Sequence, residues 1–92
     1  MSDLSLPTGW TLRPASADQS SAEHLYKAWR FKDFKEALRF VSEVGRLAET
    51  LHHHPDITLG WGYVTLSLTT HDEGGVTALD VKLASAIEDL NT

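Results

Sequence analysis

The chain has 92 residues, a formal net charge of −5 with its histidines neutral, and no cysteine. Its length fits a single domain over residues 1–92 with a modest core, so self-association would be a natural way to bury more surface. The absence of cysteine excludes disulfides and cysteine-based zinc sites, and the acidic balance argues against a nucleic acid partner, which would need a basic stripe.

The first third of the chain indicates two strands separated by a polar segment. A short candidate strand runs from Trp10 to Arg13, and residues 14–23 are rich in Ser, Ala and Asp, which is typical of a loop. In the following segment HLYKAWRF, Leu25, Trp29 and Phe31 share one parity. This alternation predicts a half-buried strand.

The apolar period changes to that of a helix at Asp33. The apolar stripe consists of Phe34, Ala37, Leu38, Val41, Val44, Leu47, Ala48 and Leu51. Asp33 can cap the first turn, with Glu36 at the N3 position. Pro55 ends the segment, because the residue before a proline is pushed out of the α region. The pattern predicts a helix from about Asp33 to His52.

The segment ITLGWGYVTLSLTT predicts a β-hairpin. Gly60 and Gly62 flank Trp61 and permit a tight turn or bulge. Beyond the turn, apolar and polar residues alternate, and the apolar set that shares one face is Val64, Leu66 and Leu68. Gly74 and Gly75 interrupt the chain again.

A second amphipathic helix follows, and its apolar positions are Leu79, Leu83, Ala86, Ile87 and Leu90. Thr77-x-x-Asp80 at its start is a capping box. The element order is therefore β-β-α-β-β-α. The simplest way to bury both helical stripes is to pack the two helices on one face of a four-stranded antiparallel sheet, so the expected fold class is α+β.

Four histidines lie close to the predicted hairpin: His52, His53 and His54 before it, and His71 at its end. Imidazole can donate or accept a proton near neutral pH, and the partial negative charge at a helix end favours its charged form. Asp80 could orient or charge one of the rings. The alternatives are solvated histidines, a purely capping Asp80 and a solvated Glu49 on the helix face.

A metal site is not predicted, because adjacent helical residues diverge by about 100° and no cysteine or carboxylate completes a familiar ligand spacing. Helical phase leaves the place of His53 open. In an unbroken helix His53 would face solvent, opposite the stripe from Val44 to Leu51. For it to reach a pocket, either the outer face forms the pocket or the last turn unwinds before Pro55.

Taken together, these spacings resemble the signature of the pterin-4a-carbinolamine dehydratases. The residues that carry the signature are Glu49, His53, His54, Pro55, Trp61, His71 and Asp80. The segment WRFKDF, the Gly9–Trp10 pair and the ending LASAIEDL are also similar to that family. The resemblance therefore runs from about Gly9 to Leu90, a domain core of about residues 9–90, and it implies the same fold that the residue patterns predict.

The resemblance also implies a reaction. Members of this family remove water from 4a-hydroxytetrahydropterin, the form in which aromatic amino acid hydroxylases leave their cofactor, and give quinonoid dihydropterin. This elimination needs an acid for the departing oxygen and a base for the N5 proton. It implies neither a metal nor a cofactor, because the pterin is the substrate.

By the same resemblance, His53, His54 and His71 fall on the catalytic positions, with His53 and His71 as the main proton-transfer groups. His54 would position the pterin. The expected supporting residues are Asp80 as a hydrogen-bond partner of this set, Glu49 and Pro55 in the pocket wall, Thr70 as a contact to the pterin ring, and Trp10 as an apolar wall. Spacing does not assign acid against base. One departure is His52, since relatives often have an acidic residue there.

The family resemblance implies a homodimer or homotetramer that works alongside an aromatic amino acid hydroxylase. A rival hypothesis is a non-catalytic dimerisation, assembly or transcription-coactivator module on the same fold. Intact His53, His54, His71 and Asp80 favour catalysis. Residues 1–15 show no signal-peptide pattern, and no apolar run approaches the roughly 20 residues of a membrane span. The expectation is a cytoplasmic protein without membrane association.

Overall fold

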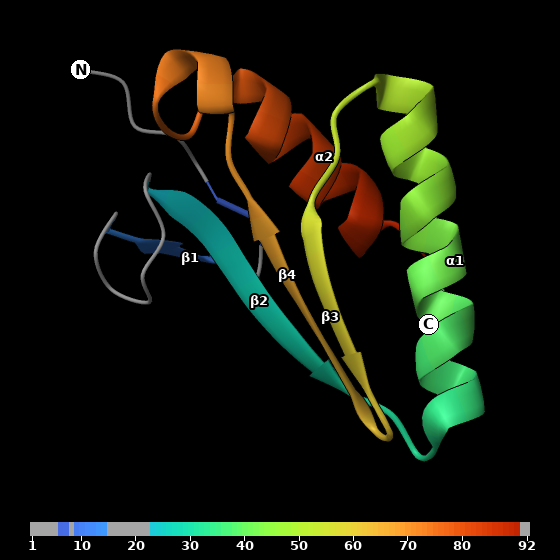
Figure 1. Ribbon diagram of the computed structural model, residues 1–92. Coiled ribbons are helices and arrows are strands. Elements are labelled where there is room, and N and C mark those ends of the chain that lie inside the picture. Colours follow the sequence, from blue (N-terminus) through green and yellow to red (C-terminus); the bar gives the residue numbers. More distant parts are fainter. Residues whose placement is uncertain (1–5, 8, 15–22, 91–92) are drawn as a thin grey trace.

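The computed structural model describes residues 6–7, 9–14 and 23–90, except for the side chain of His71 (Figure 1). Along the chain the elements are β1 (Thr11–Arg13), β2 (His24–Arg30), α1 (Phe34–Leu51), β3 (Asp56–Gly60), β4 (Tyr63–Leu68), the short 3₁₀ helix η1 (His71–Glu73) and α2 (Ala78–Glu88). The four strands form one antiparallel sheet in the order β1-β2-β4-β3. The predicted α+β class and element order are confirmed. Most of the loop expected over residues 14–23 lies outside the described residues.

The core lies between one face of the sheet and the two helices. The predicted alternation of β4 is confirmed, because Val64, Leu66 and Leu68 are fully buried. Leu25 of β2 stands opposite Leu68 in register and is buried as well. From the helical side, α2 contributes Leu83 to the same cluster. The alternating apolar residues of the strands and the apolar face of the helix therefore pack together in one core layer.

Helix α1 begins as its sequence predicts. The Asp33 side chain accepts a hydrogen bond from the Glu36 amide at 2.9 Å, which satisfies one of the free donors of the first turn. The expected apolar stripe is only partly covered. Of its positions, Ala37, Val44 and Ala48 are buried, whereas Phe34 and Leu38 are 43% and 46% exposed. The flank of the helix that carries Phe34 and Leu38 is therefore not covered by the rest of the described structure. Phe40 is buried although the predicted stripe did not include it.

The N-terminal strand is attached to the last turn of α2 through Glu88. The Trp10 indole Nε1 donates to Glu88 Oε2 at 2.9 Å, and Lys27 Nζ lies 2.7 Å from the same oxygen. Trp10 is 5% exposed and packs edge-on against Trp29, with ring centroids 5.5 Å apart. An aromatic side chain with a satisfied N–H thus fixes β1 against the core.

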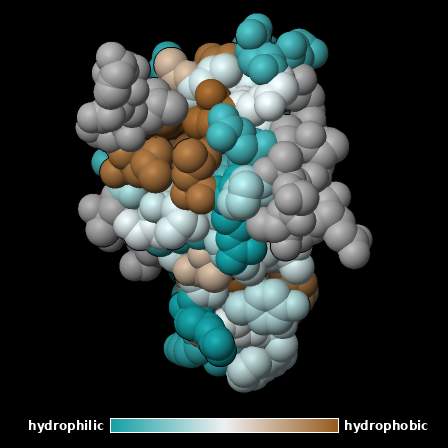
Figure 2. All heavy atoms as spheres, turned by 90° about the vertical axis from the view of Figure 1, so that its left-hand side faces the viewer, coloured by the Kyte–Doolittle hydropathy of each residue, from teal (hydrophilic) through white to brown (hydrophobic). Residues whose placement is uncertain are grey.

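Several large apolar side chains remain on the surface: Leu12, Phe34, Leu38, Ile57, Trp61, Tyr63 and Leu79. Figure 2 shows the side of the molecule that carries β1, where apolar surface gathers in one area beside polar surface. Leu12 of β1 is 52% exposed.

Among the described residues, no helix is both long and apolar enough to cross a membrane.

Candidate active site

The end of α1 decides where the histidines point. His52 adopts the left-handed conformation with φ of 54°, its amide donates to the Glu49 carbonyl, and the His53 amide donates to the Ala48 carbonyl at 3.1 Å. This is the Schellman pattern that ends a helix, here with a histidine in the place usually taken by glycine. The chain therefore leaves the helical phase before Pro55, which is one of the two routes that the sequence left open for His53.

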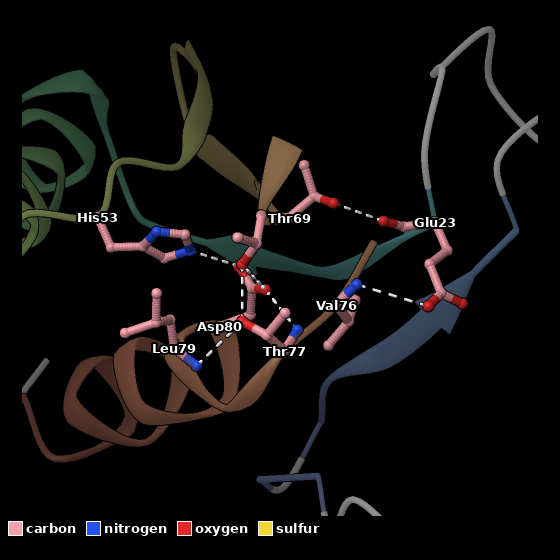
Figure 3. Close-up of polar contacts among 8 residues, drawn as sticks. Glu23, His53, Thr69, Val76, Thr77, Leu79 and Asp80 are labelled. Carbon is pink, nitrogen blue, oxygen red and sulfur yellow. Dashed lines mark hydrogen bonds and ion pairs between the residues drawn. The ribbon is translucent and has the colours of Figure 1, made fainter. Parts of the chain in front are cut away.

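The turn brings His53 to Asp80, in the first turn of α2. His53 Nε2 lies 2.5 Å from Asp80 Oδ1, and the Asp80 side chain is fully buried (Figure 3). The other carboxylate oxygen, Oδ2, accepts from the Thr77 amide at 2.8 Å and from the Thr70 hydroxyl at 2.7 Å. The sequence left a capping role and an orienting role open for Asp80. The structure shows both contacts, one on each oxygen.

This arrangement fixes the hydrogen-bonding role of the His53 ring. Opposite an ionised Asp80, which only accepts hydrogen bonds, Nε2 is the donor and a neutral His53 carries its proton on Nε2. Nδ1 then has a free lone pair. No hydrogen bond to Nδ1 is found among the described residues. Because every buried polar side-chain atom of these residues has a partner, Nδ1 is accessible to solvent. With 12% of the His53 side chain exposed, Nδ1 is the ring atom available for proton transfer.

His54 and Glu49 form a second pair, on the surface. His54 Nε2 lies 2.5 Å from Glu49 Oε2, and the two side chains are 59% and 79% exposed. Within the described part of the chain, Glu49 pairs with His54 and makes no hydrogen bond or ion pair with the group around Asp80. His52 is exposed as well, and Pro55 joins these residues to the start of β3.

Thr70 connects the site to the segment that carries His71. Its amide donates to the Gly75 carbonyl at 2.9 Å, and its carbonyl accepts from the Glu73 amide at 2.9 Å. These contacts close the turn that contains η1. The backbone of His71 follows Thr70 directly, so its Cα lies about 3.8 Å from that of Thr70. The His71 side chain is outside the described part of the structure.

An open surface hollow of about 420 Å³ adjoins this network, and its lining residues are Thr70, Asp72, Glu73, Thr77, Ala78 and Leu79. A volume of this size is in the range of small-molecule sites. Thr70 and Thr77 belong to both the wall of this hollow and the Asp80 network. The two threonine hydroxyls that belong to the Asp80 network therefore border this hollow, whereas His53 is not among its lining residues.

Trp10 does not join this group. Its indole binds Glu88, eight residues after Asp80 on α2, which corresponds to about 12 Å along the helix axis. Trp10 packs in the core against Trp29, and the ring contact and hydrogen bond that it makes do not involve the residues around Asp80, where a pocket wall was expected.

Two residues near the site were not expected from the sequence. Thr77 was predicted only as a helix cap, yet its hydroxyl lies 2.8 Å from that of Thr70. Glu23 accepts from the Thr69 hydroxyl through its carbonyl at 2.7 Å, and its carboxylate lies over Gly75, near the Val76 amide (Figure 3). A β-carbon at Gly75 would come within 2.8 Å of Glu23 Oε2, so a larger residue there would require the Glu23 side chain to move. No local pattern indicates these contacts, because the partners of Glu23 are about fifty residues away.

Fold and site together define a small α+β protein with a buried histidine–aspartate pair beside a surface hollow. The chain belongs to the pterin 4 alpha carbinolamine dehydratase family, whose model matches residues 2–90. The family expected from the sequence is thereby confirmed.

Relatives of known name agree with this assignment. A protein of Sulfurisphaera tokodaii is 39% identical over 90 residues, which cover 98% of this chain and 88% of the relative. A protein of Synechococcus sp. is 46% identical over 72 residues, covering 78% of this chain and 77% of the relative. Both are provisionally named pterin-4-alpha-carbinolamine dehydratases.

Solved structures share the fold. A transcriptional coactivator/pterin dehydratase from Brucella melitensis has a TM-score of 0.73 and 33% identity, over 88% of this chain and 80% of that one. A pterin dehydratase-like protein described as a RuBisCO assembly factor of the alpha-carboxysome has a TM-score of 0.68 at 18% identity, over 87% of this chain and 86% of that one, and shows the likeness of the fold alone.

Proposed function

We propose that this protein removes water from 4a-hydroxytetrahydropterin and gives quinonoid dihydropterin. Family membership and the names of the relatives support the class of reaction. The observation that carries the proposal is the His53–Asp80 pair, in which a buried carboxylate holds an imidazole whose other nitrogen makes no hydrogen bond among the described residues.

The reaction is an elimination without net oxidation or reduction. A base takes the proton from N5, the electrons of that bond form the double bond between N5 and C4a, and the bond between C4a and the hydroxyl oxygen breaks. The oxygen takes a proton from an acid and leaves as water. We propose that the protein needs no cofactor, since the pterin is the substrate and side chains can supply both proton transfers.

In this proposal His53 transfers a proton through Nδ1, while Asp80 holds Nε2. The Asp80 carboxylate then faces the positive charge that the ring acquires. His71 is the second proton-transfer group, because the backbone of η1 starts next to Thr70. His54 contacts the pterin from the surface side, with Glu49 and Pro55 beside it.

The test is stopped-flow absorbance of 4a-hydroxytetrahydropterin decay with wild-type protein and with the double variant His53→Ala/His71→Ala. Positioned acid–base groups contribute about 10²–10⁴-fold, so the double variant should lose at least two orders of magnitude in rate. Wild-type decay no faster than in buffer would overturn the proposal.

His52→Asn is the matched control. It removes the neighbouring imidazole and keeps a residue that tolerates the left-handed conformation found at this position. Because His52 is exposed and contacts the helix end only through its backbone, its substitution should leave the decay rate within about twofold. A loss as large as that of the double variant would show that the assay does not report on His53 and His71.

A second candidate function is a dimerisation, assembly or coactivator module. It is favoured by the Brucella melitensis relative, whose name joins both activities, and by the exposed Phe34 and Leu38 on α1. A homodimer or homotetramer that works beside an aromatic amino acid hydroxylase is compatible with either function. A folded wild-type protein that associates but does not accelerate the decay would favour this second candidate.

A further inference from the structure

We infer that Thr70 is a positioning residue that holds the Asp80 carboxylate toward His53, with Thr77 as its partner. The inference rests on the proposed function for its kinetic consequence. It replaces the expectation that Thr70 offers its hydroxyl or backbone to the pterin ring.

The hydroxyl hydrogens around Asp80 have one consistent direction. Thr77 Oγ1 accepts from the Leu79 amide at 3.2 Å and lies 2.8 Å from Thr70 Oγ1. Thr70 Oγ1 in turn donates to Asp80 Oδ2 at 2.7 Å. A hydroxyl has a single hydrogen to donate, so Thr77 donates to Thr70 and Thr70 donates to Asp80.

The polar groups of Thr70 are therefore already used. Its hydroxyl hydrogen is bound to Asp80, its amide is bound to the Gly75 carbonyl, and its carbonyl accepts from the Glu73 and Gly75 amides at 2.9 and 3.3 Å. Thr70 has no remaining donor for a substrate. What the side chain can do is fix the rotation of the carboxylate to which His53 donates.

Geometry shows why one hydroxyl matters. Asp80 is fully buried and its carboxylate accepts three hydrogen bonds: from His53, Thr70 and the Thr77 amide. A buried carboxylate that loses a donor rotates or recruits another one. Because Oδ1 and Oδ2 turn together, a change at Oδ2 moves the partner of His53. Thr70 also begins the turn that carries His71, so it links the two proposed proton-transfer groups.

The experiment compares Thr70→Val with Thr70→Ser, and uses Thr65→Val as the matched control. Valine has nearly the shape of threonine but no hydroxyl, and serine restores the hydroxyl. Thr65 is a β4 residue whose side chain makes no hydrogen bond to the described residues. Proton–nitrogen correlation spectra report which ring nitrogen of His53 carries the proton. Stopped-flow decay of 4a-hydroxytetrahydropterin gives kcat and KM separately.

For Thr70→Val we expect the His53 signals to move away from the Nε2-protonated pattern and kcat to fall about 10- to 100-fold, the range typical of residues that orient a functional side chain. KM should change less than threefold, and Thr70→Ser should recover most of kcat. Thr65→Val should match the wild type. Where the valine variant does not fold, Thr70→Ala, which adds no atom to the site, is judged by the same criteria.

A raised KM with kcat unchanged would overturn the inference and return Thr70 to a substrate contact. Unchanged His53 signals in the valine variant would overturn it as well. If the wild type itself shows no turnover, the proposed function fails, yet the spectra still decide whether Thr70 orients His53 through Asp80.

Discussion

Helix α2 carries one carboxylate in each of its end turns, and the two have different partners. Asp80, in the first turn, is fully buried and accepts from the His53 ring, the Thr70 hydroxyl and the Thr77 amide. Glu88, in the last turn, is 26% exposed in its side chain and accepts from Lys27 and the Trp10 indole. Both link segments that are far apart in the sequence.

The chemistry of the donor separates a structural contact from a catalytic candidate. A lysine ammonium and an indole N–H keep the same charge near neutral pH, so the contacts of Glu88 do not change state there. An imidazole gains or loses a proton in this range, so the contact of Asp80 can differ in charge between two steps of a reaction. A comparison of the two carboxylates by their exposed fraction alone would not reveal that only the partner of Asp80 can change its charge near neutral pH.

The largest effect is expected for Asp80→Asn. The amide group cannot accept at both positions, so it must present its NH₂ either to His53 Nε2 or to the donors Thr70 and Thr77. We expect kcat for the 4a-hydroxytetrahydropterin decay to fall about 10²–10⁴-fold, as when an orienting carboxylate loses its charge. Stopped-flow kinetics on a variant shown to be folded by circular dichroism would measure it. Activity within threefold of the wild type would show that Asp80 only caps the helix.

Glu88→Ala should lower the stability of the fold and leave the activity nearly unchanged. It removes one partner of the partly buried Lys27 and the acceptor of the Trp10 indole, so we expect unfolding in urea to show a loss of about 1–3 kcal/mol, with activity within about threefold. Glu88→Gln should lose less stability, because the amide oxygen can still accept from Trp10. A fall in activity as large as that of Asp80→Asn would contradict the distinction between the two carboxylates.

The fold could be predicted because its determinants are local. The alternation of Val64, Leu66 and Leu68, the cap at Asp33 and the Thr77–Asp80 capping box each involve neighbours within a few residues. Family signature spacing singled out His53 and Asp80 as members of one site, 27 residues apart. The structure adds which nitrogen meets which oxygen.

The remaining features depend on contacts that no local pattern contains. Helical phase alone left His53 facing solvent or pocket, because the outcome depends on a left-handed residue at His52, where glycine would have been the sequence signal. The Thr70–Thr77 hydroxyl contact needs the closed turn between them. Trp10 was expected in a pocket wall and packs in the core, since its indole N–H finds Glu88 at the other end of α2.

The smallest effect is expected at the surface pair of Glu49 and His54, which has the same 2.5 Å separation as His53 and Asp80. With side chains 59% and 79% exposed, water screens this pair and replaces either partner. A double-mutant cycle of Glu49→Ala and His54→Ala in urea unfolding should give a coupling energy of at most about 0.5 kcal/mol, and 1 M salt should abolish it. A coupling above about 1 kcal/mol would mean that distance, rather than burial, sets the strength of both histidine–carboxylate pairs. A weak coupling would mean that the strength of the His53–Asp80 pair comes from burial, because the fully buried Asp80 cannot exchange the His53 ring for water.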